Sequence, residues 1–231
     1  MRQSGSQIVR GRTAQISLLR NRPRVLISGA CRGVGQACAE ALAEGGAELI
    51  LCDRDASGLR EISDALGAIG IPCDVASETS VASFAADLSQ RFASLDMVIN
   101  AAGGGYERTL GMYRMSRALL PALQRGTYKL LLNVPPSLEE AKAAIFPYTS
   151  SRLGFERLSS ALAFETSGMS VAVMIACPGT RRIVRVLPDP DAGGWIDTYD
   201  LRRPGREDVL SLAVQVASLV GRSPASRRQA G

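Results

Sequence analysis

Short apolar segments alternate with segments of helical length along most of this 231-residue chain. Six apolar runs rich in Val, Ile and Leu are predicted to be strands, at 24–28, 48–53, 68–74, 96–101, 128–134 and 170–176. Helices are predicted at about 33–45, 56–66, 78–93, 107–125, 147–167 and 206–220. Such alternation is typical of βαβ units, whose strands are parallel and buried on both faces. The pattern therefore predicts an α/β fold, a doubly wound parallel sheet of six or seven strands with helices on both faces.

The two ends of the chain differ in composition from this central part. Several arginines and no acidic residue precede Glu40, so residues 1–22 are predicted to be a basic N-terminal arm, with a transit peptide as the alternative. Residues 23–220 are predicted to form the domain, and residues 221–231 a polar C-terminal tail.

The composition excludes several classes of function. The sequence has no histidine, which excludes Ser-His-Asp and Cys-His triads, histidine-ligated zinc and a histidine general base. Its five cysteines form no CxxC pair, which is typical of reduced thiols in the cytoplasm, and no metal site is expected. No apolar run reaches the about 18 residues of a membrane span. The net charge of +5 comes mostly from scattered arginines, so neither nucleic acid nor membrane is expected as a partner.

A glycine-rich turn joins the first predicted strand to the first predicted helix. Gly29 is suited to the tight turn, Gly33 to close approach of a pyrophosphate, and Gly35 to close packing of the helix on the strand. The free N–H groups and the dipole at the start of that helix favour an anion. The strand–turn–helix context therefore predicts a dinucleotide site, although a glycine turn that binds nothing is the alternative.

Asp53 ends the second predicted strand, 18 residues after Gly35. A carboxylate at this place accepts hydrogen bonds from a ribose 2′-hydroxyl and repels a 2′-phosphate, which favours NAD as the cofactor. Arg32 and Arg54 leave NADP open, because either guanidinium can pair with a 2′-phosphate.

At this point the residues resemble those of the short-chain dehydrogenases/reductases, a family with a Rossmann-type fold. The resemblance covers about residues 24–220 and rests on the glycine turn, on Cys73-Asp74-Val75, on Asn100-Ala101-Ala102-Gly103, on Tyr148 with Arg152, and on Cys177-Pro178-Gly179. It implies that a nicotinamide dinucleotide is held by Ser28, Gly29, Cys31, Arg32, Gly33, Val34, Gly35, Asp53, Arg54, Asp74, Val75, Asn100, Ala101, Ala102, Gly103, Tyr148, Arg152, Pro178 and Gly179.

The family carries an Asn-Ser-Tyr-Lys tetrad, and this chain departs from it. Tyr148 matches the tyrosine, and Arg152 replaces the lysine four residues later, which keeps a positive charge that lowers the tyrosine pKa. Pro136 stands at the serine, with Ser137 as a possible substitute, and Arg108 stands at the asparagine. The resemblance therefore assigns Tyr148 as the acid/base, Arg152 as its electrostatic partner, and Ser137 as a third catalytic candidate.

Three functions remain open from the sequence. The first is an NAD(P)-dependent oxidoreductase with weak or altered hydride transfer between the cofactor and a small-molecule carbonyl or alcohol substrate. The second is a non-catalytic dinucleotide-binding protein that acts as a sensor or partner subunit. The third is a scaffold whose cofactor site is vestigial.

Several smaller features carry further expectations. The helices at about 107–125 and 147–167 are the usual dimer faces in this family, which implies a homodimer or homotetramer. The family's last strand is missing, so residues 7–19 or 183–187 are candidates for the sheet edge. Residues 189–195 are expected to form a lid, with Trp195 and Tyr199 lining a substrate pocket or packing the loop. Cys31 in the glycine turn is a small filler or a redox-active thiolate.

Overall fold

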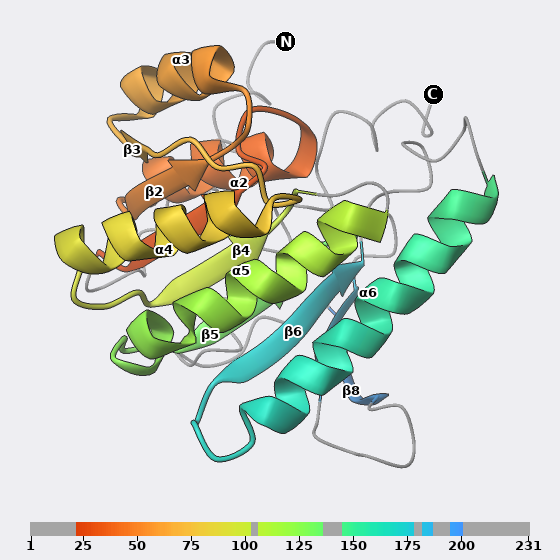
Figure 1. Cartoon of the computed structure of the whole chain (residues 1–231). Helices are drawn as coiled ribbons and strands as arrows, with labels where there is room; N and C mark the ends of the chain where they lie inside the picture. The colour runs from red at the N-terminus through yellow and green to blue at the C-terminus, as the bar shows by residue number, and fades with distance from the viewer. Residues whose placement is uncertain (1–21, 103–105, 136–144, 178–181, 187–194, 201–231) are drawn as a thin grey trace, which may run out of the picture.

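One sheet divides two layers of helices (Figure 1). The computed structural model describes residues 22–102, 106–135, 145–177, 182–186 and 195–200. The helices are α2 Gly33–Glu44, α3 Ala56–Leu66, α4 Glu78–Arg91, α5 Tyr106–Gln124 and α6 Ile145–Glu165. The strands are β1 Arg24–Ser28, β2 Glu48–Cys52, β3 Ile69–Gly70, β4 Met97–Asn100, β5 Leu130–Asn133, β6 Ala172–Cys177, β7 Arg182–Val186 and β8 Trp195–Asp200.

The strands lie in the order β3-β2-β1-β4-β5-β6-β7-β8. The first six pair in parallel, and β7 and β8 are antiparallel to their neighbours. The order of the parallel part reverses between β1 and β4, which is the switch point where dinucleotides bind in Rossmann folds. The predicted doubly wound parallel sheet is therefore confirmed.

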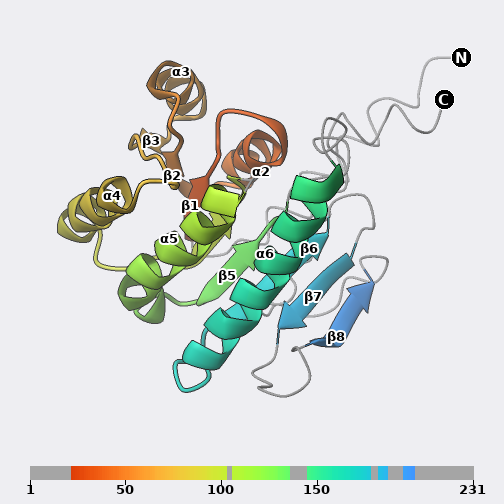
Figure 2. The same ribbon diagram turned by 45° about the vertical axis from the view of Figure 1, so that its right-hand side comes forward.

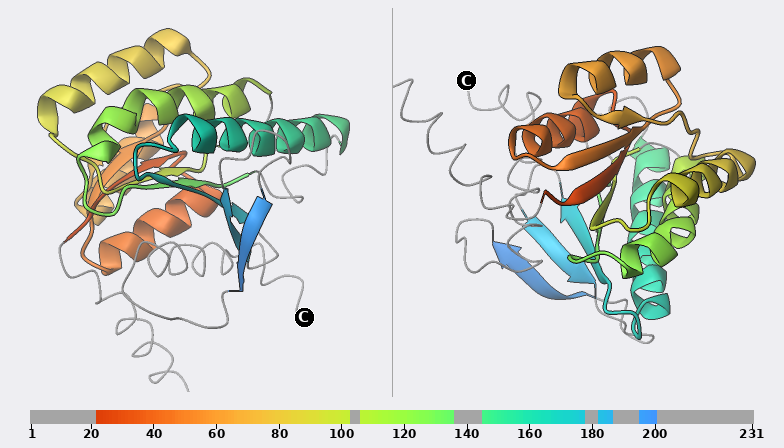
Figure 3. Two further views of the ribbon diagram at one scale, coloured as in Figure 1. Left: turned by 90° about the horizontal axis from the view of Figure 1, so that it is seen from below. Right: turned by 90° about the vertical axis from the view of Figure 1, so that its left-hand side faces the viewer.

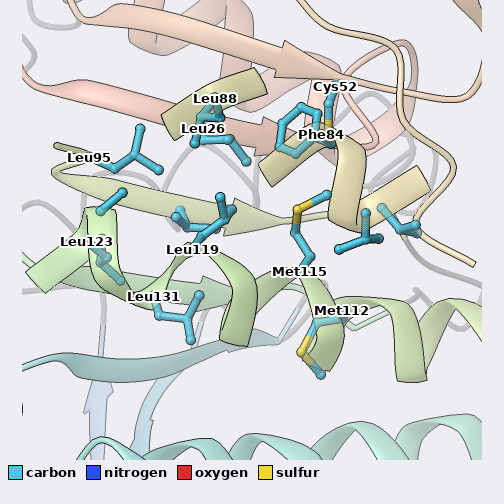
Figure 4. Close-up of a cluster of buried hydrophobic side chains, with 14 of the residues drawn as sticks. Leu26, Cys52, Phe84, Leu88, Leu95, Met112, Met115, Leu119, Leu123 and Leu131 are labelled. Carbon is cyan, nitrogen blue, oxygen red and sulfur yellow. The ribbon is translucent and has the colours of Figure 1, made fainter. Parts of the chain in front are cut away.

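Alternating side chains of the central parallel strands point into two cores, one on each face of the sheet. Leu26, Val98 and Leu131 pack on one face against α4, α5 and α6, and Phe84 of α4 lies in the same cluster (Figures 2 and 4). The intervening residues, such as Ile27, pack on the other face against α2 and α3. Helix α2 lies below the sheet in Figure 3 (left). Both faces of the central strands are thus buried, which explains their continuous apolar sequence.

The third strand is much shorter than the predicted 68–74, because only Ile69 and Gly70 pair with β2 as a regular ladder. Pro72 lies between two residues whose N–H groups face β2, so its own nitrogen faces the open edge, where proline is tolerated. Extended backbone nevertheless continues beside β2, since Ile71 N donates to Leu51 O at 2.9 Å and Cys73 N donates to Asp53 O at 3.0 Å. The helix predicted at 206–220, the arm and the tail lie outside the described residues, apart from Arg22. No described helix is both long enough and apolar enough to cross a membrane.

The sheet has eight described strands, not the six or seven that were predicted. The difference arises because β7 and β8 add an antiparallel ribbon beyond β6. Strand β7 includes most of the edge candidate 183–187, whereas the alternative edge segment, 7–19, lies outside the described residues. The first six strands thus correspond to the predicted strands. The sequence did not predict the β7–β8 ribbon, since Trp195 was expected in a lid and Tyr199 beside a pocket or loop.

The direction of β7 corrects the expectation for Trp195. Val186 pairs with both Val173, near the start of β6, and Trp195, at the start of β8. Trp195 therefore lies at the amino edge of the parallel strands, opposite to the edge where β1 ends, and its assignment to the substrate pocket is wrong. Tyr199 pairs with Ile183, nearer the carboxyl edge. Residues 189–194 of the expected lid lie outside the described residues.

Candidate functional site

The glycine turn follows β1 directly and leads into α2. Gly29 has φ +72° and Gly33 has φ +57°, both in the left-handed region that residues other than glycine rarely adopt. Arg32 is the extended residue before α2, and it provides no side-chain cap to the first helical turn. The N–H groups at the start of α2 therefore donate to no side-chain cap at Arg32. Helix N-termini with such uncapped N–H groups bind anions.

Two backbone approaches require glycine here. A Cβ on Gly29 would lie 2.7 Å from the Ala102 Cα, in the segment that follows β4. A Cβ on Gly35 would lie 2.0 Å from the Gly29 carbonyl oxygen. The turn, the first turn of α2 and the end of β4 are thus packed backbone against backbone. Ala101 and Ala102 lie at this approach, and Val34 lies between Gly33 and Gly35 at the start of α2.

Asp53 fixes the end of β2 to the glycine turn. Its carboxylate is 8% exposed and accepts hydrogen bonds from Cys31 N at 3.2 Å and from Asp55 N at 3.1 Å. Each oxygen keeps a further lone pair with which it can accept a hydroxyl group. Arg32 and Arg54, which are exposed beside it, make no ion pair with another residue that the structure describes.

The environment of Cys31 favours the small filler over the redox-active thiolate. Burial, together with the charge and hydrogen bond of Asp53, raises the pKa of the Cys31 thiol to about 11. Burial is the largest of these effects, and the charge of Asp53 is the next. Cys31 is therefore a neutral thiol near neutral pH, and its role as a redox-active thiolate is not supported.

Asp74 and Val75 form the adjoining side of the same edge. Asp74 Oδ1 accepts from Ala76 N at 3.1 Å, and Asp74 N donates to Ser80 Oγ at 3.0 Å, so this loop is held by its own side chains. A Cβ on Gly111 of α5 would lie 2.1 Å from the Val75 carbonyl oxygen. Gly111 thus sets the approach of α5 to this loop. The sequence reasoning missed it, because an isolated glycine within a helical pattern does not reveal its partner.

A buried chain of hydrogen bonds joins the carboxyl ends of three strands to two helices. Ser28 Oγ donates to Asn100 Oδ1 at 3.5 Å. Asn100 Nδ2 donates to Asn133 Oδ1 and to Ser116 Oγ, both at 2.9 Å. Asn133 Nδ2 donates to Ser159 Oγ at 3.0 Å. All five side chains are at most 2% exposed, so the polar groups depend on one another for hydrogen bonding.

The two helical serines of this hydrogen-bond chain also donate their own hydroxyl protons. Ser116 Oγ donates to Met112 O at 2.7 Å within α5, and Ser159 Oγ donates to Phe155 O at 2.8 Å within α6. Only Ser28 and Asn100 were named as site residues from the sequence. The signal for Asn133 and Ser159 was a polar residue in an otherwise apolar segment, but such a residue does not identify its partner.

The catalytic candidates follow from the position of α6. Tyr148 and Arg152 lie on this helix, one turn apart. Since Ser159 bonds to Asn133 at the end of β5, Tyr148 lies about 16 Å earlier along the helix axis, beyond the carboxyl ends of the strands. That is the side on which ligands bind in open α/β sheets.

Arg108 lies at the start of α5, near α6. The next residue, Thr109, has its Cγ2 3.7 Å from the position of a Cβ on Gly154, so the first turns of α5 pack against α6. The structure thus brings together at one edge the described residues of the glycine turn, Asp53, the Asp74 loop and the end of β4. Four site candidates lie outside the described residues, namely Gly103, Ser137, Pro178 and Gly179, and so does Pro136, which stands at the serine of the tetrad.

Comparison with known proteins identifies relatives of this chain. The family model described as short chain dehydrogenase matches residues 23–184. L-fucose dehydrogenase of Oryctolagus cuniculus is 31% identical over 195 residues, which is 73% of this chain and 68% of that protein. The rhamnolipids biosynthesis 3-oxoacyl-[acyl-carrier-protein] reductase of Pseudomonas aeruginosa is 28% identical over 228 residues, covering 85% and 89%.

Solved structures agree with these sequence matches. The Pseudomonas aeruginosa RhlG/NADP active-site complex has a TM-score of 0.63 and 26% identity, and the alignment covers 84% of this chain and 88% of that one. A short-chain dehydrogenase from Streptomyces avermitilis has a TM-score of 0.58 and 27% identity, covering 68% and 67%. The likeness therefore extends from the sequence motifs to the arrangement of the sheet and helices.

The buried hydrogen-bond chain predicts a difference between two adjacent serines of α6. Ser159→Ala leaves the N–H of Asn133 without its partner, so we expect the free energy of unfolding to fall by about 1–3 kcal/mol. Ser160→Ala removes only a local bond to Glu156 O on a partly exposed surface, and we expect a change within about 0.5 kcal/mol. Denaturant unfolding of both variants measures the difference, and equal losses would contradict the role of the chain.

Proposed function

Because this chain belongs to the short-chain dehydrogenase family, we propose that it is an NAD(P)-dependent oxidoreductase that interconverts a carbonyl and an alcohol. The observation that carries the proposal is the cradle after β1. A Cβ on Gly29 or Gly35 would collide with neighbouring backbone atoms. Gly33, the first residue of α2, has a left-handed backbone. A backbone packed in this way fits a dinucleotide pyrophosphate.

Different residues at the carboxyl edge of the sheet would bind different parts of the cofactor. The turn from Ser28 to Gly35 would hold the pyrophosphate, Asp53 the adenosine ribose, and Asp74 with Val75 the adenine. Asn100 would support the turn after β4, to which Ala101, Ala102 and Gly103 belong. Pro178 and Gly179 would lie at the nicotinamide. When bound, the nicotinamide supplies or accepts the hydride, and the protein positions the substrate and handles the proton.

Tyr148 is the proposed acid/base of this reaction. Its hydroxyl would donate a proton to the carbonyl oxygen during reduction and accept it during oxidation. Arg152, one helical turn away, would stabilise the phenolate and contact the ribose, but it holds its own proton near neutral pH and so takes no part in a relay. Ser137 is the proposed third donor, in place of the serine that Pro136 replaces.

We favour NAD over NADP because of the Asp53 carboxylate. It is held in place by two backbone N–H groups, and its charge opposes a 2′-phosphate. The alternative, NADP, is supported by the exposed Arg32 and Arg54 and by the relative whose structure is an NADP complex. The two relatives are named for different substrates, a sugar and a 3-oxoacyl group, so the likeness supports the reaction type and leaves the substrate open.

A non-catalytic dinucleotide-binding protein is the second candidate function. It is favoured by Pro136 and Arg108, which stand where the family carries a serine and an asparagine. Loss of one donor to a developing oxyanion lowers the rate by about 100- to 1,000-fold. The glycine turn and Asp53 support cofactor binding in either case, so binding and turnover are separate questions.

We also propose that the protein is a homodimer or homotetramer that associates through α5 and α6. Leu153 and Phe164 of α6 are each 58% exposed, and they are 11 residues apart, which is about three helical turns. They therefore lie on one side of the helix, and a large exposed apolar pair of this kind favours contact with another subunit.

The cofactor assignment predicts opposite changes for the two dinucleotides. Asp53→Asn removes the carboxylate charge, so we expect NADH affinity to fall by about tenfold or more, since a hydrogen bond to a charged group is worth about 1.5–3 kcal/mol. NADPH affinity should be unchanged or rise. Calorimetric titration of both dinucleotides measures this, with Asp64→Asn on exposed α3 as the control. No binding of either dinucleotide to the wild type at millimolar concentration would contradict the proposed function.

The acid/base assignment predicts a loss of turnover without a loss of binding. Tyr148→Phe should lower the rate by about 10²- to 10⁴-fold and leave NADH affinity within a few-fold. The assay follows NADH or NADPH oxidation with a panel of 3-oxoacyl thioesters and aldoses. Tyr128→Phe, before β5 at the amino edge, is the control. Turnover by Tyr148→Phe equal to the wild type would exclude the role of Tyr148, and no turnover by the wild type would favour the non-catalytic candidate.

The subunit contact predicts weaker association when charge is added to α6. Phe164→Glu should shift the dissociation constant of the oligomer upward by about tenfold or more, because burial of a Phe side chain is worth about 1.5–3 kcal/mol. Sedimentation equilibrium measures the shift. Ala82→Glu on the exposed side of α4 adds the same charge elsewhere and should leave association unchanged. A monomeric wild-type protein would contradict the proposed association through α5 and α6.

A further inference from the structure

The loop between β3 and α4 carries the proposed adenine contacts and also bonds to a second helix. Asp74 and Val75, which we assign to the adenine, belong to this loop, and Ser77 caps α4 directly after it. Helices α4 and α5 pack side by side on one face of the sheet (Figures 1 and 2). The position of the loop therefore depends on α5 as well as on the strand and helix that it joins.

Two residues of α5 contact two consecutive carbonyl groups of the loop. A Cβ on Gly111 would lie 2.1 Å from the Val75 carbonyl oxygen, so the helix backbone comes close to the loop at this point. Arg114 Nη1 donates a hydrogen bond to the Ala76 carbonyl oxygen at 3.4 Å. Residues three positions apart share one face of a helix, so the close approach at Gly111 also brings Arg114 to the loop.

The backbone of Ala76 connects this bond to the proposed adenine contact. Asp74 Oδ1 accepts a hydrogen bond from Ala76 N at 3.1 Å, which orients the carboxylate within the loop. The carbonyl group of the same residue is held by Arg114. A rotation of the Ala76 backbone would weaken both bonds together, because one residue supplies the donor to Asp74 and the acceptor for Arg114.

A second contact of Arg114 contributes less to the position of the loop. Arg114 Nη2 lies 3.9 Å from Glu78 Oε2, and the Glu78 side chain is 81% exposed. Water and salt screen an exposed ion pair of this kind, so it contributes little. The Arg114 side chain is only 28% exposed, and its bond to the Ala76 carbonyl is better shielded. The hydrogen bond is thus the contact through which Arg114 acts on the loop.

We propose that Arg114 is a positioning residue for the adenine end of the dinucleotide. It acts through the Ala76 carbonyl and holds the Asp74 carboxylate where this group accepts the 6-amino group of adenine. The role requires a donor at the end of a long side chain, and it requires no contact between Arg114 and the cofactor. An apolar side chain at this position would leave the Ala76 carbonyl without its partner, and the loop would open more often.

The experiment compares two dinucleotides on the full-length protein by calorimetric titration. NADH carries the 6-amino group, whereas reduced nicotinamide hypoxanthine dinucleotide carries an oxygen in its place. Arg114→Met should lower the affinity for NADH by about three- to tenfold, because the bond from adenine to Asp74 is weakened. The affinity for the hypoxanthine dinucleotide should fall by less than about twofold, since it lacks that bond. Equal losses for the two dinucleotides would indicate a general loss of structure and would overturn the proposal.

Three further variants separate the hydrogen bond from the charge and from the ion pair. Arg114→Lys keeps a long side chain with donors, so it should recover part of the lost NADH affinity. Glu78→Gln removes only the exposed ion pair and should leave NADH affinity unchanged. Arg91→Met breaks an ion pair with Asp87 in the last turns of α4, and this matched control should also leave NADH affinity unchanged. Equal losses in Arg114→Met and Arg91→Met, or no recovery in Arg114→Lys, would contradict the role of the bond.

The inference rests on the proposed function, and failure of the two is distinguishable. Hydrogen exchange on the protein without any cofactor measures the loop directly. Arg114→Met should raise the exchange rate of the Ala76 amide several-fold and leave that of Ile99 in β4 unchanged. Unchanged exchange at Ala76 would overturn the proposal. If the wild type binds neither NADH nor NADPH, the proposed function fails and the adenine role fails with it, while the exchange rate still decides whether Arg114 holds the loop.

Discussion

The buried hydrogen-bond chain from Ser28 to Ser159 is the interaction on which the arrangement of the site depends. It joins the ends of β1, β4 and β5 to α5 and α6, and every side chain in it is buried. Because a buried polar group without a partner is costly, the chain is favourable only when all its members are in place. It therefore fixes the height of α6 relative to the sheet, and with it the position of the helical turns that carry Tyr148 and Arg152.

The nucleotide side of the edge is held by a different kind of constraint. There the backbone itself is close packed, at Gly29 against Ala102, at Gly35 against Gly29, and at Gly111 against Val75. Asp53 adds a side-chain bond from β2 to the same turn. A larger side chain at any of these glycines would displace backbone rather than another side chain. The shape of the proposed dinucleotide cradle is thus a consequence of how the strands and helices pack.

The same difference explains what the sequence predicts well and what it does not. Strand β1 and helix α3 have the predicted bounds, because buried parallel strands and the Asp55 and Gly67 caps leave local signals. Strands β7 and β8 were not recognised as a ribbon, since their pairing is set by β6, a distant partner. The substrate-pocket alternative for Trp195 was wrong for this reason, and the thiolate alternative for Cys31 is not supported because Asp53 approaches it only in the fold.

The proposed cofactor binding and the proposed catalysis therefore depend on different parts of the structure. The cradle depends on backbone approaches that also hold the fold together, so a change there would disturb the sheet. The proposed catalytic residues would instead act through their side chains, from the first turns of α5 and α6. Arg108 and Arg152, which stand where the family has an asparagine and a lysine, are compatible with intact helices and an intact buried chain of hydrogen bonds. Retention of the fold consequently supports a retained cofactor site more strongly than it supports an unchanged reaction, because fold alone does not determine function.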